Sequence, residues 1–164
     1  MKSLFILQLV CCVITAMLAL QLAMASLQVR WKVWRYEISR WILVASMLFF
    51  SVHYLLQMIH GLRAQGTDVG AAFNILFYTP VAFAITLSII NIESTGNKVR
   101  RYCLRGMMAY ILIAIVFVIG MFKSQSLHIG NMLYVMLGLF VASMAYFILI
   151  IRKETKARKQ KLME

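Results

Sequence analysis

The chain has 164 residues, of which 63% are hydrophobic and only 13% are charged, with a single proline and a mean hydropathy of +0.84. Water-soluble domains carry about 25% charged residues, so the composition excludes that class and predicts an integral membrane protein. The formal net charge of +12 would suit a nucleic-acid-binding surface. The basic residues, however, cluster in short segments between and after apolar runs, so we expect no direct binding of nucleic acid.

Five apolar runs reach the length of about 20 residues that is needed to cross the hydrocarbon core of a bilayer. None of them shows the two-residue alternation of membrane β-strands, and a helix satisfies its backbone groups internally. The sequence therefore predicts an all-α fold, a polytopic membrane bundle of five transmembrane helices in one domain. The predicted spans are residues 4–26, 41–60, 71–91, 103–122 and 131–151, followed by a basic tail at 152–164.

The distribution of lysine and arginine indicates the orientation, because such residues in short loops are held on the cytoplasmic face. All 17 lie on one side of the predicted bundle except Lys2, Arg63 and Lys123. This predicts an N-terminus outside the cell and a cytoplasmic C-terminus. The small residues 23–26 also resemble a signal-peptide cleavage site, and cleavage there would reverse every later loop. The length of the first run and the charge asymmetry favour a retained span.

Aromatic and basic residues alternate between the first two predicted spans, over residues 29–41. Beside membrane helices, indole and phenol rings lie at the level of the lipid headgroups while cations face anionic lipid. We therefore expect this segment to anchor the bundle at the bilayer surface, with Trp31, Trp34, Tyr36 and Trp41 as the interfacial anchors.

The only proline, Pro80, falls near the middle of the third predicted span. It lacks an N–H and clashes with the carbonyl of Leu76, which predicts a kink and a freed acceptor. Polar residues on the same turns, Asn74, Tyr78 and Thr79, are candidate partners for it. Pro80 is thus a candidate hinge, with a static kink as the alternative.

The fifth predicted span carries Gly138 and Ala142 at the spacing that permits close helix packing, with this chain or with a second copy. Beyond it the sequence has no proline or glycine, so the helix is expected to continue into the tail, with Glu154 and Arg158 spaced for an ion pair. The tail is either a basic anchor near anionic headgroups or the start of an output helix.

The chain shows no catalytic motif, and no carboxylate lies centrally in a predicted span. Proton relays and cation transporters usually place a carboxylate there. The three cysteines, Cys11, Cys12 and Cys103, are interpreted as small packing residues. We therefore expect a protein that is not an enzyme and that holds no cofactor.

Polar residues gather in the second and third predicted spans, where the sequence predicts a modest pocket opening outward. The expected lining is Ser51, His53, Tyr54, Gln57, Asn74, Tyr78 and Thr79. A haem is disfavoured because His53 has no second histidine in another span. A weaker alternative is a metal or pH-sensing site at the outer surface, formed by His60, Asp68 and His128.

Four segments resemble the N-terminal membrane region of bacterial multi-pass membrane regulators: residues 35–46, 53–71, 74–80 and 126–130. In that family about seven helices precede a cytoplasmic output domain, often an AraC-type helix-turn-helix and sometimes a kinase. The resemblance covers nearly the whole chain, but its motifs are packing and loop signatures and imply no catalytic residue. It implies a bacterial cytoplasmic (inner) membrane protein whose final spans and cytoplasmic effector domain are missing from this sequence.

These features favour a non-catalytic sensory or anchor module of a bacterial signalling or transcription-regulating protein. Two alternatives stay open. The chain could be a small carrier, with a polar path between the second, third and fifth helices. It could also be a structural subunit that forms a homodimer or joins a larger membrane complex.

Overall fold

The computed structural model describes residues 2–25, 33–62, 65–93 and 96–163. Within these ranges the regular structure is helical, and each of the five helices is long and apolar enough to cross a membrane. This confirms the predicted all-α class and the number of candidate spans. The helices are α1 (Lys2–Met24), α2 (Val33–His60), α3 (Thr67–Glu93), α4 (Gly96–Ser124) and α5 (Met132–Met163).

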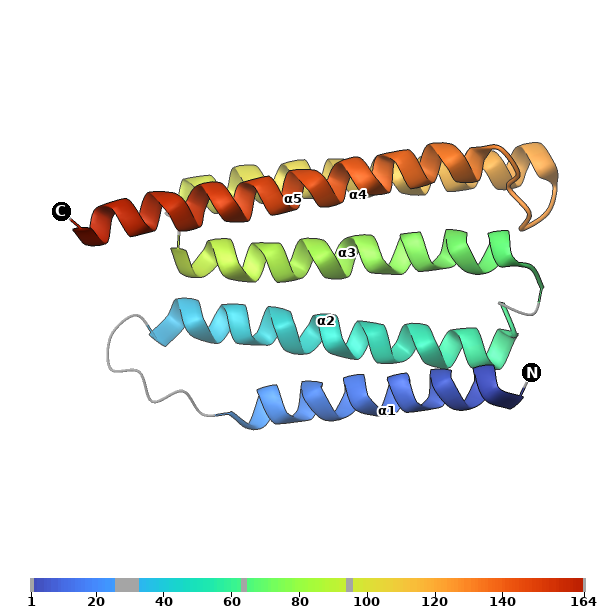
Figure 1. Cartoon of the computed structure of the whole chain (residues 1–164), viewed down its shortest axis with the longest axis horizontal. Helices are drawn as coiled ribbons and strands as arrows, with labels where there is room; N and C mark the ends of the chain where they lie inside the picture. Colours follow the sequence, from blue (N-terminus) through green and yellow to red (C-terminus); the bar gives the residue numbers. More distant parts are fainter. Residues whose placement is uncertain (1, 26–32, 63–64, 94–95, 164) are drawn as a thin grey trace.

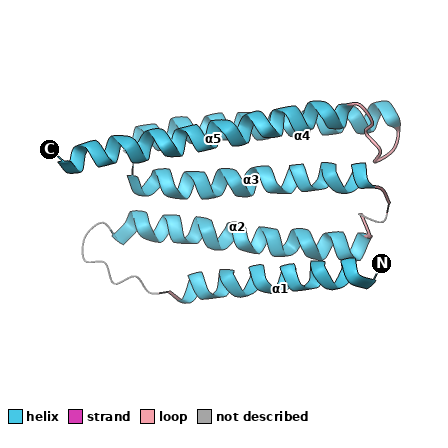
Figure 2. Ribbon diagram, in the orientation of Figure 1, coloured by secondary structure: helices cyan, strands magenta, loops and turns pink. Residues whose placement is uncertain are grey.

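Successive helices run in opposite directions, so the two termini lie at opposite ends of the bundle (Figures 1 and 2). We call the end where α2 stops at His60 and where α5 begins the histidine end. The other end, where α2 and α4 begin and α5 projects beyond its neighbours, is the basic end. Among the described residues, those expected on the cytoplasmic side lie at the basic end.

Four of the five helices begin before the predicted spans, with the largest differences in α2 and α4. The sequence analysis starts the second and fourth spans at Trp41 and Cys103, whereas α2 starts at Val33 and α4 at Gly96. A hydropathy search stops where charged residues begin, but a helix continues as long as its backbone can form i to i−4 hydrogen bonds. Most of the predicted anchor segment is therefore the first two turns of α2. α5 runs without interruption past residue 151 to Met163.

α3 contacts more of the other helices than α1, α2, α4 or α5 does. Among the described residues, α1 packs only against α2, whereas α3 contacts α2, α4 and α5. α3 is therefore the single connection between the α1–α2 pair and the α4–α5 pair. A buried apolar cluster joins α3 to that second pair, and its fully buried members include Ala72, Ile113 and Met136.

Two glycines differ in how closely a neighbouring helix approaches them. A Cβ on Gly106 of α4 would lie 2.0 Å from Cε2 of Phe83 on α3, so the glycine leaves room for the phenylalanine ring. A Cβ on Gly138 of α5 would meet nothing within 4 Å. Gly138 and Ala142 are both exposed, so within the described chain this pair makes no close helix contact, and packing against a second copy stays a prediction.

Candidate functional site

A hydrogen-bonded chain of polar side chains links the first three helices. Asn74 of α3 is its centre, because its Oδ1 accepts from Gln57 Nε2 at 2.7 Å and lies 3.1 Å from His53 Nε2. Gln57 Oε1 in turn accepts from Gln8 Nε2 of α1 at 3.0 Å. His53 and Gln57 are each 1% exposed, so the predicted pocket is closed at these two side chains. We call Gln8, His53, Gln57 and Asn74 the polar network.

The sequence analysis missed the contribution of α1. One turn after Gln8, the Sγ of Cys12 lies 3.3 Å from Ser51 Oγ, and Ser51 Oγ donates to the Cys12 carbonyl at 3.2 Å. Cys12 was interpreted as an apolar packing residue, yet it pairs with a residue of the predicted pocket. The available signal was the four-residue spacing of Gln8 and Cys12, which places both on one face of a helix.

Aromatic rings surround His53 on the other side. Its ring stacks on Phe77 with a centroid separation of 4.4 Å, and Tyr78 meets it edge-on at 5.6 Å. Tyr54, from the next position of α2, lies at 5.5 Å. A buried imidazole with a hydrogen bond at one edge and aromatic faces around it is held in a fixed orientation. Tyr54 and Tyr78, which were both predicted to line a pocket with His53, therefore lie next to it in the structure.

Thr79 and Pro80 lie beside the polar network but do not join it. Thr79 is fully buried, and its hydroxyl donates to the Ile75 carbonyl at 2.7 Å. Thr79 was one of three candidate donors to the Leu76 carbonyl, which Pro80 leaves without its intrahelical hydrogen bond. α3 continues as a helix through Pro80, and the assignment of this residue as a hinge stays a prediction.

A second polar contact, which the sequence analysis did not predict, joins α2 to α3 toward the basic end. Ser39 Oγ donates to the Ser88 carbonyl at 3.0 Å, and Ser88 Oγ donates to the Ser39 carbonyl at 3.1 Å. Asn91 Nδ2 adds bonds to the Arg35 carbonyl and to Ser39 Oγ. Reciprocal bonds between small side chains and backbone require close helix approach, as is typical of membrane interfaces.

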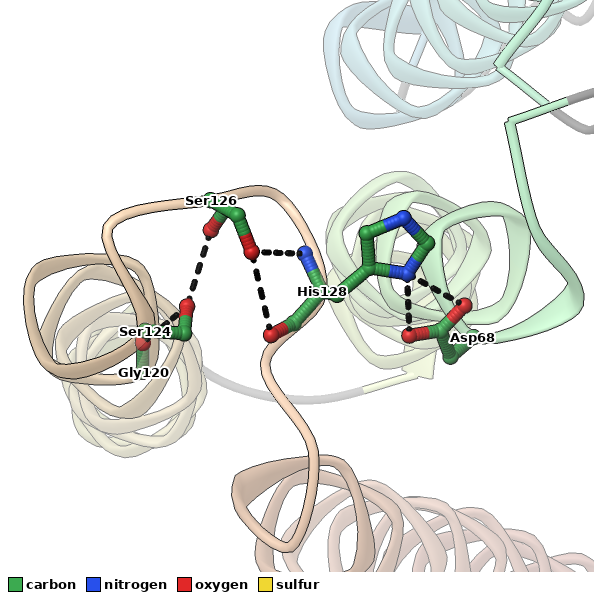
Figure 3. Close-up of polar contacts among 5 residues, drawn as sticks. All are labelled: Asp68, Gly120, Ser124, Ser126 and His128. Atoms are coloured by element: carbon green, nitrogen blue, oxygen red, sulfur yellow. Dashed lines mark hydrogen bonds and ion pairs between the residues drawn. The ribbon is translucent and has the colours of Figure 1, made fainter.

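At the histidine end, the loop between α4 and α5 is held against the start of α3 (Figure 3). His128 Nδ1 lies 2.8 Å from Asp68 Oδ2 and 3.1 Å from Oδ1. A Cβ on Gly66 would lie 2.6 Å from the Asp68 carboxylate and 2.8 Å from the His128 ring, so the glycine leaves space for this pair. The contact is exposed to solvent and therefore sensitive to salt.

Two serines order the same loop (Figure 3). Ser124 Oγ donates to the Gly120 carbonyl at 2.9 Å and lies 3.0 Å from the Ser126 carbonyl, while Ser126 Oγ accepts the His128 amide at 3.1 Å. Of the predicted metal set, the structure brings together Asp68 and His128. Among the described residues no group of three or more histidine, cysteine, aspartate or glutamate side chains is placed to hold a metal ion.

Glu154 lies where α5 meets the start of α4, and it is 7% exposed. Tyr102 Oη donates to its Oε1 at 3.0 Å, and Lys98 Nζ lies 3.7 Å from its Oε2. The carboxylate therefore interacts across the α4–α5 interface. The side chain of Arg158, with which the sequence analysis paired Glu154, lies outside the described residues.

Three of the four predicted interfacial anchors, Trp34, Tyr36 and Trp41, lie on the first turns of α2. Trp34 and Trp41 are 76% and 54% exposed, and Tyr36 is half-buried; Trp31 lies outside the described residues. Arg40 binds Glu37 at 2.7 Å, donates to the Ala25 carbonyl just after α1, and stacks over the Trp41 ring at 5.6 Å. Arg40 thus ties the end of α1 to the start of α2.

The comparisons with known proteins do not add a function to this geometry. No family model matches the chain, and neither the curated proteins nor the solved structures gave a significant match.

Proposed function

We propose that this chain is a non-catalytic sensory module of a bacterial inner-membrane signalling protein, with its N-terminus outside and its basic end in the cytoplasm. A cue that reaches the outer half of the bundle alters the polar network, and α3 carries the change to α5. The position of α3 is the observation that supports this proposal. In the described part of the chain, α3 is the one helix that contacts both pairs. It also supplies Asn74 to the network and contains Pro80.

The polar network suits an input site because its side chains are largely buried and bonded to one another. Buried polar side chains are costly when a hydrogen-bond partner is lost, so a change at one member favours rearrangement of the others. Asn74 and Pro80 are six positions apart on α3, or about 9 Å along its axis. A rearrangement at Asn74 therefore acts less than two turns from Pro80, which has no backbone N–H to donate within the helix.

Distance measurements between spin labels in nanodiscs test this coupling. The labels are placed at exposed positions on α2 and α5, Leu48 and Lys159, through an unnatural amino acid that leaves the native cysteines unchanged. We expect Asn74→Leu to shift the distance distribution, and Pro80→Ala to suppress that shift. The matched control is Asn131→Leu, an exposed asparagine outside the network. Equal distributions for wild type and Asn74→Leu, with helical content retained, would refute the coupling.

The expected output domain is tested separately by the size of the native protein in bacterial membranes, with an antibody against residues 65–71. A band well above 18.8 kDa supports an input module of a longer regulator. A band at that mass removes the support for a missing effector. Labelling of Lys123 and Lys153 with a membrane-impermeant reagent on intact cells tests the orientation, and we expect only Lys123 to react.

One observation favours a second candidate, a structural subunit. Gly138, Ala142 and Ala145 lie on α5 and are exposed, which leaves a face of small residues available to another helix. A carrier is less favoured because α2 and α5, which were expected to line its path with α3, do not contact each other among the described residues. Cross-linking in native membranes discriminates: Gly138→Ile should abolish a cross-linked dimer if this face is an interface.

A further inference from the structure

A groove lies between α2 and α3, halfway along both helices. Its volume is about 300 Å³, at the lower limit of the range of about 300–1,000 Å³ for small-ligand sites. Pro80, the central residue of α3, is one of its lining residues, so the groove lies near the middle of a candidate span. We call it the midspan groove. The lining includes Ala45, Ser46 and Phe49 of α2, and Pro80, Val81 and Ala84 of α3.

Contacts at both ends of the midspan groove fix α2 and α3 relative to each other. Toward the histidine end, Phe49 stacks on Phe77 with a centroid separation of 4.9 Å. Toward the basic end, Ser39 and Ser88 exchange their reciprocal bonds about one turn beyond the lining residues. The two helices cannot close over the groove without breaking one of these contacts. The groove is therefore preformed, as small-ligand sites usually are.

The lining favours a neutral, lipid-soluble ligand. Every lining residue is uncharged, and each lies more than two helical turns along the chain from any residue whose side chain is not described. A charged ligand would lose its hydration in hydrocarbon without gaining a partner from the lining. Since the groove belongs to the middle of two candidate spans, its occupant must arrive through the bilayer.

Two lining residues define the chemistry of that ligand. Ser46 is 4% exposed, and its hydroxyl donates to the Ile42 carbonyl at 2.5 Å. That bond uses the only proton of the hydroxyl, whose oxygen still has acceptor capacity for a ligand. Phe49 is 39% exposed, so part of its ring is available to a second aromatic ring. The complementary ligand carries an aromatic ring and a hydroxyl donor.

We propose that the midspan groove binds a small lipid-soluble phenol, with its ring against Phe49 and its hydroxyl donating to Ser46 Oγ. Ala45 and Ala84, on opposite walls, leave the space that the ring occupies. The proposal concerns binding alone and does not depend on the sensory function, so either can fail without the other.

Equilibrium binding of radiolabelled 4-tert-butylphenol to the full chain in nanodiscs tests this site, with empty nanodiscs as the blank for partition into lipid. We expect saturable binding of one molecule per chain. The analogue without the hydroxyl, tert-butylbenzene, should compete about fivefold less well, the factor expected for one net hydrogen bond. Ser46→Ala should lower the affinity for the phenol about fivefold and leave that for tert-butylbenzene within about twofold.

Two steric variants and a matched control keep the test decisive. Ala84→Leu fills the groove from α3, and Ala45→Leu fills it from an exposed position of α2, where the larger side chain does not disturb the fold. Each should weaken binding of the phenol at least about tenfold. Ala142→Leu adds the same side chain at an exposed position of α5 and should change the affinity less than about twofold.

Four results would overturn the proposal. They are binding that does not saturate, as expected if lipid chains merely cover the groove, equal affinities for the phenol and tert-butylbenzene, wild-type binding by Ala45→Leu, and an equal loss in Ala142→Leu. Loss of a cross-linked dimer in Ala45→Leu would assign the groove to a second copy of the chain instead.

Discussion

The contact between Gly106 and Phe83 gives the sharpest quantitative test of the packing. Replacement of Gly106 by alanine places a Cβ 2.0 Å from Cε2 and 2.2 Å from Cδ2 of Phe83. Since ordinary carbon contacts begin near 3.4 Å, the ring must move by about 1.4 Å. It has little room, because Phe147 of α5, which is 3% exposed, lies 5.8 Å away between ring centroids.

The expected magnitude is the difference between two opposing effects. Alanine is a better helix former than glycine by about 1 kcal/mol, while overpacking of a filled interface costs about 1–3 kcal/mol. Gly106→Ala should therefore lower the free energy of unfolding by about 1 kcal/mol. Gly138→Ala is the matched control, because its Cβ meets nothing within 4 Å, and it should be neutral or stabilising by up to about 1 kcal/mol.

The difference in unfolding free energy between Gly106→Ala and Gly138→Ala measures the steric clash with Phe83, because both variants gain the same helix propensity. Unfolding is followed by circular dichroism as the SDS fraction is raised in mixed micelles. The two variants should differ by about 2 kcal/mol, or about 30-fold in the unfolding equilibrium. Phe83→Ala in the Gly106→Ala background should remove most of the clash. A difference below about 0.5 kcal/mol would refute the proposed close contact of α3 and α4.

Three further substitutions test other contacts of the structure. Ser88→Ala removes one of two reciprocal bonds between α2 and α3 and should cost about 0.6 kcal/mol in the same unfolding assay. Ser143→Ala, whose hydroxyl bonds within its own helix, should cost less, and equal losses would count against the interhelical bond. Tyr102→Phe removes one donor to the buried glutamate of α5 and should cost about 1.5 kcal/mol; no measurable loss would argue against this hydrogen bond. Asp68→Asn weakens the contact to His128, so the α4–α5 loop should be cleaved faster in limited proteolysis, with a smaller difference from wild type at high salt. Unchanged cleavage at low salt would argue that this pair does not hold the loop.

Part of the candidate site could be predicted from the sequence. Polar residues within apolar runs are conspicuous, and His53, Gln57 and Asn74 were identified on that basis. Their hydrogen-bond partners were not, because a partner such as Gln8 belongs to a different helix, and its rotation and depth depend on packing. For the same reason the burial of His53 and Gln57 could not be predicted, because it depends on how α1 and α3 pack against α2.

The sequence by itself determined the helical class and the number of candidate spans, because lipid offers no hydrogen bonds and an apolar run of sufficient length must satisfy its backbone as a helix. It also determined the separation of charge between the two ends. Only the tertiary structure decided which helices are neighbours, that α3 connects the two pairs, and that Gly106 rather than Gly138 permits close approach within the chain. The physical reason is that apolar side chains suit lipid and helix interfaces almost equally, so hydropathy identifies a span without identifying the face that packs.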